Sequence, residues 1–263
     1  ATLTNSLMRG WQYDMLDRAV ENLVGHVKVQ ASEYRDDPNM AHSFVLPANY
    51  EPEISGMEVA GWAPRIKVPA VILSERQSRG VQLVGIDPAR ENISFFSELV
   101  FAGETLADKD DGRIVIGAEL ARQLQTAVGR KLVGLSQGAD GKNRERGFRI
   151  AGTFDADGTS LEKAFAFTGL TSTQAFLGDR SSDSPRPLVT EVSVLLADEL
   201  RRNDAVAELR VAFPDKDVAD WRALQPQVAE MFAMADVAIY IIFGLMMGGL
   251  AFGLVNTLIA AVM

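Results

Sequence analysis

The sequence predicts a mixed α+β domain followed by a membrane-spanning helix, and three observations carry this prediction. The chain has 263 residues, 47% of them apolar and 23% charged, which is enough apolar surface for a sizeable core. Short alternating apolar runs between turn residues recur over 25–221, as in strands interleaved with helices. From Val237 to Met263 there is no Asp, Glu, Lys, Arg or His.

Composition also excludes several classes of function. The chain has 35 Asp and Glu against 26 Lys and Arg, a net charge of −9, which disfavours a nucleic-acid partner. The absence of cysteine excludes disulfides, thiolate metal sites and a cysteine nucleophile. We expect neither a metal nor a cofactor.

The first segment, residues 1–24, reads as an amphipathic helix. Apolar residues recur every four positions through Trp11 and Met15, and Gly25 is a suitable end. Two interpretations stay open here. The segment is either an ordinary surface helix or a stalk that pairs with a second helix starting at Pro226.

Residues 25–111 form the first part of the predicted soluble domain. We expect strands over Gly25–Gln30, Arg65–Leu73 and Gly80–Asp87, because apolar and polar residues alternate there. The apolar residues between Phe95 and Phe101 are expected to pack in the core.

Residues 112–178 read as a β-rich subdomain, and residues 179–225 as a closing β-α-β part. In the first we expect strands, two helices and a hairpin around a polar turn: Gly112–Gly117, Ala118–Ala127 (helix), Lys131–Ser136, the turn Gln137–Arg146, Gly147–Phe154, Ala164–Thr168 and Thr171–Leu177 (helix). In the second we expect a strand at Thr190–Leu196, a helix at Asp198–Phe213 and a strand at Asp217–Trp221.

Residues 226–263 are predicted to be a stalk helix that continues into the membrane. Pro226 suits the first turn of a helix, and Met231 and Phe232 lie on its apolar stripe. The uncharged run from Val237 would span roughly 40 Å as a helix, against about 30 Å of hydrocarbon. The alternative is a buried core helix, which rarely runs so long without a charge.

Small residues inside this run indicate close helix packing. Gly244 and Gly248, and likewise Gly249 and Gly253, are four positions apart, and Asn256 offers a hydrogen bond across such a contact. Glycine is also common in membrane helices generally, so both interpretations stay open.

One tempting catalytic motif is better explained as structure. Gly134-Leu-Ser-Gln-Gly138 fits G-x-S-x-G, but the pattern predicts a strand after the turn rather than a helix, and both histidines precede Ser136. We therefore interpret Ser136 as a hairpin residue and expect no enzymatic activity. The sequence has no ATP-binding motif, so any energy source must be another chain.

Several stretches, in order along the chain, resemble the permeases of MacB/LolCE/FtsX-type ABC transporters. They are the opening strand Gly25–Gln30, the Gly-Ile-Asp-Pro turn within Val81–Pro88, the segment Ile114–Lys131 with Arg130 in place of the usual acid, and the strand Phe148–Phe154. The resemblance covers nearly the whole chain. It implies a MacB-like periplasmic domain with a βαβ-type and a β-rich subdomain, flanked by stalk helices.

The resemblance also implies partners and a mode of action. Such a permease is a dimer of identical or different subunits in the inner membrane, with its soluble domain in the periplasm. A separate cytoplasmic ABC ATPase supplies the energy, and the stalks pass its motion outward, a mode called mechanotransmission. The matching sequence stretches favour the lipoprotein-releasing LolC/LolE branch of the family.

In one subunit type of that branch a proline-bearing hairpin recruits a periplasmic carrier, and the hairpin here has no proline. The residues that would contact a carrier or lipoprotein are Gln137, Asp140, Lys142, Arg144 and Arg146. The competing prediction is a membrane-anchored binding or scaffold module without transport. An anchored hydrolase comes third.

Overall fold

The computed structural model describes residues 25–47, 50–156, 159–178, 187–227, 229–230, 234, 237, 241, 243–250 and 253. The chain divides into two units, of which one is Asp17–Trp221 and the other includes Arg222–Met263. The helix predicted for residues 1–24, with Trp11 and Met15, lies outside the described residues.

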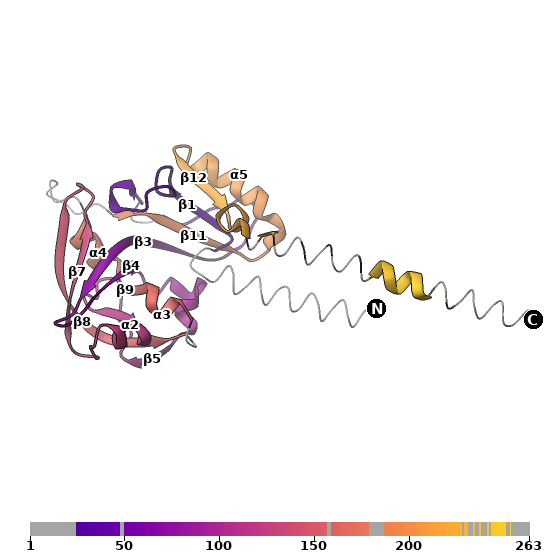
Figure 1. Ribbon diagram of the computed structural model, residues 1–263. Helices are drawn as coiled ribbons and strands as arrows, with labels where there is room; N and C mark the ends of the chain where they lie inside the picture. Colours follow the sequence, from indigo (N-terminus) through magenta and orange to yellow (C-terminus); the bar gives the residue numbers. More distant parts are fainter. Residues whose placement is uncertain are drawn as a thin grey trace, which may run out of the picture. The chain divides into compact units, whose positions relative to one another are not determined.

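Within Asp17–Trp221 short helices alternate with strands, so the expected mixed α+β class is confirmed (Figure 1). The strands are β1 (Val27–Ala31), β2 (Phe44–Val45), β3 (Val59–Leu73), β4 (Ser78–Ile86), β5 (Val100–Gly103), β6 (Ile114–Gly117), β7 (Lys131–Gln137), β8 (Asn143–Asp155), β9 (Phe165–Gly169), β10 (Leu188–Val189), β11 (Glu191–Leu196) and β12 (Lys216–Asp220). The helices are η1 (Met40–His42), η2 (Glu91–Ile93), η3 (Phe95–Glu98), α2 (Ala118–Gln123), α3 (Leu161–Ala164), α4 (Leu170–Leu177), η4 (Glu199–Arg201), α5 (Arg202–Ala212) and α6 (Trp221–Leu224).

The first and last strands of this unit form one sheet. β1 lies between β11 and β12 and is antiparallel to both, so β11, α5 and β12 make a split β-α-β unit with β1 inserted. β11 also pairs with the first half of β3. The predicted β-α-β part is therefore present, but its two parallel strands are not neighbours.

The middle strands close into a six-stranded barrel. The second half of β3 pairs with β4, and the circuit continues through β9, β6, β8 and β7 back to β3. Four of these strands come from the predicted β-rich segment 112–178, and β3 and β4 come from before it. The single long strand β3 thus belongs both to the split β-α-β sheet and to the barrel (Figure 1).

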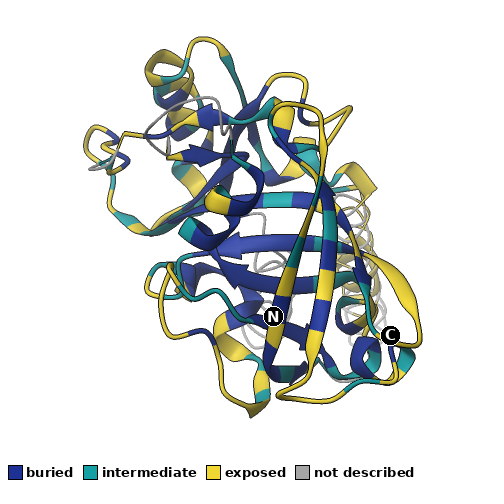
Figure 2. Ribbon diagram, turned by 90° about the vertical axis from the view of Figure 1, so that its left-hand side faces the viewer, coloured by how far each residue is buried: buried dark blue, intermediate teal, exposed yellow. Residues whose placement is uncertain are grey.

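Apolar side chains fill the barrel from every strand. They include Ile66, Val68 and Ile72 of β3, Leu83 of β4, Ala166 of β9, Ile116 of β6, Phe148 of β8 and Leu132 of β7. A second cluster covers the opposite face of β4, β6, β8 and β9 with Phe95 and Phe96 of η3. Along the β7–β8 hairpin exposed and buried residues alternate, as one-sided strands require (Figure 2).

Four local predictions were wrong. The hairpin turn is residues 138–142 rather than Gln137–Arg146, since both strands extend further. The helix predicted to Ala127 ends at Gln123, and Gln125 then adopts a φ of 51°. β3 begins six residues earlier than predicted because its first half pairs with β11. Val100, expected in the core, lies on β5 and is 72% exposed.

Beyond the split sheet and the barrel, the described residues after Pro226 have helical backbone and include Gly244, Gly248, Gly249 and Gly253. Met231, Phe232 and Asn256 lie outside the described residues. In the part of the chain that is described, no helix has both the length and the apolar character needed to cross a membrane.

Candidate functional site

A buried network of four charged residues crosses the middle of β3. Arg65 is fully buried and donates from Nε and Nη2 to the Glu91 carboxylate at 2.9 and 2.6 Å. Its Nη1 donates to Ser193 Oγ at 2.8 Å and lies 3.6 Å from Glu191 Oε1. Lys28 Nζ completes the network 2.9 Å from Glu191 Oε2.

The charges in this network balance, and the surroundings shift their pKa values. Burial lowers the pKa of Lys28 to about 8, against the attraction of Glu191. Burial also opposes ionisation of Glu191, but Lys28, Lys67 and Arg65 hold its pKa below the usual value. Because the partners come from β1, β3, β11 and η2, the network joins the two sheets where β3 passes from one to the other.

A second polar cluster fixes the end of the unit. Trp221 is 2% exposed, and its Nε1 donates to Glu199 Oε1 at 3.1 Å. Its backbone N–H donates to the His26 carbonyl at the start of β1. Arg202 bridges Glu199 and Asp220 at 2.7 and 2.8 Å. The point where the chain leaves β12 is therefore tied to β1 and to α5.

Two of the residues predicted as hairpin contacts, Arg144 and Arg146, hold the hairpin to α4, and a partner contact at them stays a prediction. Arg144 donates to the carbonyls of Phe176 and Gly178, at the C-terminal end of that helix. Arg146 Nη1 donates to the Ser172 carbonyl at 2.6 Å. Of the two, only Arg144 lies at the C-terminal end of α4, where a cation satisfies carbonyls that have no intrahelical partner.

The other three predicted residues surround the exposed turn. Gln137 Nε2 donates to the Gly141 carbonyl at 2.8 Å, and Asp140 pairs with Arg144 at 3.1 Å. Lys142 is exposed, and its backbone N–H donates to Asp140. The turn is thus an ordered, charged projection on which a partner contact at these residues stays a prediction.

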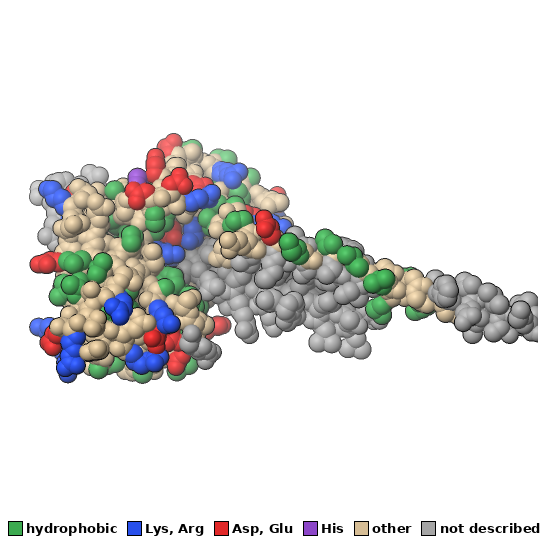
Figure 3. All heavy atoms as spheres, in the orientation of Figure 1, with side chains coloured by type: hydrophobic (Ala, Val, Ile, Leu, Met, Phe, Trp, Pro, Cys, Tyr) green, Lys and Arg blue, Asp and Glu red, His purple; other side chains and the backbone are tan. Residues whose placement is uncertain are grey.

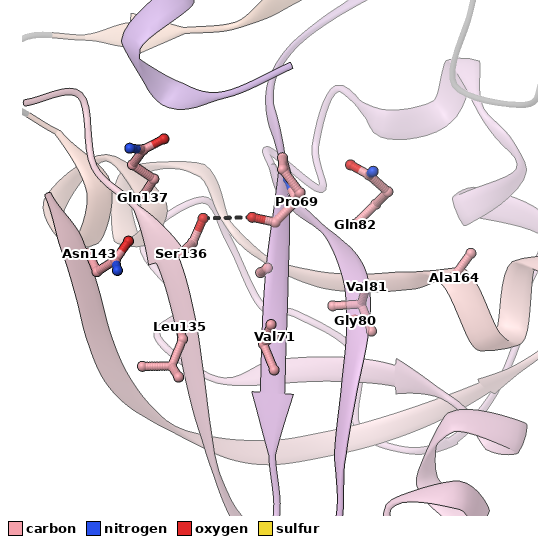
Figure 4. A pocket seen from close by; sticks show the side chains of 11 residues that line it. Pro69, Val71, Gly80, Val81, Gln82, Leu135, Ser136, Gln137, Asn143 and Ala164 are labelled. Atoms are coloured by element: carbon pink, nitrogen blue, oxygen red, sulfur yellow. Dashed lines mark hydrogen bonds between the residues drawn. The ribbon is translucent and has the colours of Figure 1, made fainter. Parts of the chain in front are cut away.

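Beside the hairpin, the outer side of β3, β4 and β7 forms an open groove of about 810 Å³ (Figure 4). Its lining includes Pro69 and Val71 of β3, Gly80 of β4 and Leu135 of β7. Hydrophobic side chains gather over these strands on this side of the molecule (Figure 3). This surface could not be predicted from the sequence, because the pairing of β7 with β3 joins residues sixty or more positions apart.

Ser136 also borders this groove, and its environment is structural. It lies inside β7, and its hydroxyl donates to the Pro69 carbonyl at 2.8 Å (Figure 4). The serine of the G-x-S-x-G motif therefore lies within a β-strand of the hairpin, as predicted.

Comparison with known proteins assigns the family. A family model of the MacB-like periplasmic core domain matches residues 1–212. The chain therefore belongs to the family of MacB-like periplasmic core domains, which confirms the resemblance found in the sequence. No match is found among curated proteins.

Two solved structures are similar to this chain. The first is the extracellular domain of the noncanonic ABC-type transporter YknZ from Gram-positive bacteria, at 14% identity and a TM-score of 0.47, covering 74% of this chain and 98% of that one. The second is a domain of a permease protein from Porphyromonas gingivalis, at 17% identity and a TM-score of 0.38, covering 71% and 83%.

Proposed function

We propose that this chain is the periplasmic part of an ABC transporter permease that passes mechanical motion from the membrane to the periplasm. The family assignment over residues 1–212 is the observation that carries the proposal. In this proposal residues 226–263 form the stalk and membrane helix, with Met231 and Phe232 in the stalk and Asn256 among the packing residues. A cytoplasmic ABC ATPase, a second permease subunit and the lipid bilayer are its partners.

The anchoring of Trp221 supports this mode of action. A displacement of the chain beyond residue 221 would pull on β12, which pairs with β1 over five residues. The bonds of Trp221 to Glu199 and His26 oppose local fraying at that point. Motion would then reach the barrel through β3, because that strand is continuous between the two sheets.

For the substrate, we propose lipoprotein release from the inner membrane, with a periplasmic carrier docking at the hairpin turn. The exposed Asp140 and Lys142 side chains supply charges for such a contact. A combined Asp140→Ala and Lys142→Ala variant should reduce carrier binding while lowering the thermal unfolding midpoint by less than about 4 °C, because losing the Asp140–Arg144 pair costs about 1 kcal/mol or less. Unchanged carrier binding would reject the hairpin as the docking site.

A stalk variant tests the mechanical proposal. Proline at Met231 removes a helix hydrogen bond and kinks the helix, so Met231→Pro should retain ATP hydrolysis by the assembled transporter and abolish transport. Met231→Ala is the matched control and should transport normally. Normal transport by Met231→Pro would contradict the mechanism. If depletion of the ATPase leaves the cellular phenotype unchanged, the chain is an anchored binding module instead.

A further inference from the structure

The outer face of the barrel over β3 and β7 is apolar and uncovered in the described part of the chain. Paired residues on these strands point the same way, and the apolar ones form a continuous strip. Val71 is 41% exposed and Val133 is 40% exposed. The strip consists of Pro69, Val71, Leu73, Val133 and Leu135, and we call it the outer strip. On the neighbouring wall the outward-facing Phe167 is instead covered by Phe96.

Two glycines flank the outer strip at positions where the fold would also accommodate a larger side chain. Gly80 pairs with Val71 from β4, and Gly147 pairs with Val133 from β8. Neither has positive φ, and a Cβ at either position would meet nothing within 4 Å. Glycine inside a strand weakens it and often marks a place where another backbone approaches closely. Because the two glycines have no side chain, nothing rises above the sheet on either side of the strip at these positions.

The width of this surface suits an α-helix. β4 and β7 pair with β3 on its two sides, so they lie about 9.6 Å apart at the usual strand spacing. A helix with its side chains is about 10–12 Å across. The amides of Gln82 and Asn143 border the groove and offer hydrogen bonds to a partner's polar flank.

The positive charge at one end of the strip indicates which charge a partner should carry there. Lys131 and Arg149 are directly opposite each other on β7 and β8, an arrangement that destabilises a sheet. Arg149 Nη1 donates to the Gly129 carbonyl at 2.9 Å, and within the described ranges neither side chain has a carboxylate partner. Farther along β8, Glu145 faces the same side. Acidic residues would thus be favoured at the Lys131 end only.

We propose that the outer strip is a docking surface for an amphipathic helix of another protein, with its apolar face on Val71 and Leu135 and acidic residues at the Lys131 end. The flat glycine flanks admit the helix backbone, and the paired cations fix its direction. This surface is separate from the hairpin turn and from the Trp221 anchor.

The test uses the full chain in detergent and a fluorescent synthetic peptide of roughly 18 residues, about five helical turns, with a leucine stripe and glutamates at one end. Binding is measured by anisotropy. We expect saturable binding with an affinity in the micromolar range. Gly80→Val with Gly147→Val should weaken it at least tenfold, as should Lys131→Glu with Arg149→Glu. The valine variants should fold at least as stably as the wild type, since the positions are open and valine favours strands.

Controls separate this proposal from its alternatives. Ala102→Val, which enlarges an exposed side chain on β5, should leave binding unchanged. Absence of saturable binding, equal binding of a peptide with lysines in place of glutamates, or equal binding by the valine variants would overturn the proposal. Two further results would also overturn it. One is that the chain binds phosphatidylcholine–phosphatidylglycerol vesicles and the same variants abolish this binding. The other is that the chain self-associates and the same variants abolish the self-association.

Discussion

Replacing Glu91 with leucine should show how strongly the buried charge network constrains the fold. The Glu91 carboxylate accepts three hydrogen bonds from Arg65, and both side chains are at most 1% exposed. Glu91→Leu keeps a similar volume but leaves the guanidinium buried with Glu191 at 3.6 Å. Breaking a buried ion pair from one side costs about 3–5 kcal/mol. For a unit of this size that lowers the unfolding midpoint by roughly 6–20 °C.

Thermal and urea unfolding of the full chain, followed by circular dichroism and tryptophan fluorescence, measures this loss. The control Glu51→Leu removes an exposed ion pair with Arg90 and should cost less than about 1 kcal/mol. Adding Arg65→Met to Glu91→Leu should restore most of the stability, because Lys28 and Glu191 then remain as a neutral pair. A loss below about 1 kcal/mol, or a double variant less stable than the single one, would refute this reasoning.

Three further predictions concern other positions. Arg113 holds the pKa of Asp111 at about 2, below its usual 3.8, so about 2 kcal/mol of stability is present above pH 3.8 and lost as pH falls toward 2. When the free energy of unfolding is measured against pH in this range, Asp111→Asn should reduce its slope. An unchanged slope would contradict the assignment. Gly117→Ala should destabilise the fold by more than about 2 kcal/mol in urea, because its Cβ would lie 2.0 Å from the Glu162 carbonyl oxygen, whereas Gly80→Ala should be neutral or stabilising. Trp221→Phe keeps the apolar ring but loses the bond to Glu199, and should cost about 1.5–3 kcal/mol by urea midpoint; no loss would show that this bond does not anchor the segment.

The strands were predictable from sequence where one face is buried. Alternation along β4, with Val81 and Leu83 buried and Gln82 only half-buried, is visible as a period of two. Helix ends were less predictable, since nothing local signals that Gln125 adopts a positive φ. Arg144 and Arg146 looked like turn residues because charge favours exposure, but tertiary contacts with α4 place them on a strand.

The features that could not be predicted from the sequence all depend on contacts between residues far apart in the chain. Closure of the barrel requires β7 to meet β3, and no local pattern specifies that contact. Arg65 was predicted as the first residue of a strand, and no local pattern indicates that it forms buried ion pairs with Glu91 and Glu191. The outer strip was invisible for the same reason, since Val71 and Leu135 become neighbours only after closure.

The position of β1 has a consequence for synthesis of the chain. Lys28 and its partner Glu191 are 163 residues apart, and both neighbours of β1 in the sheet come later than residue 190. At ribosomal rates of about 5–20 residues per second, β1 waits roughly 8–33 s before its first neighbour exists. During that interval its apolar residues and unpaired backbone are exposed to aggregation, so the nascent chain should depend on chaperones that bind the segment around β1.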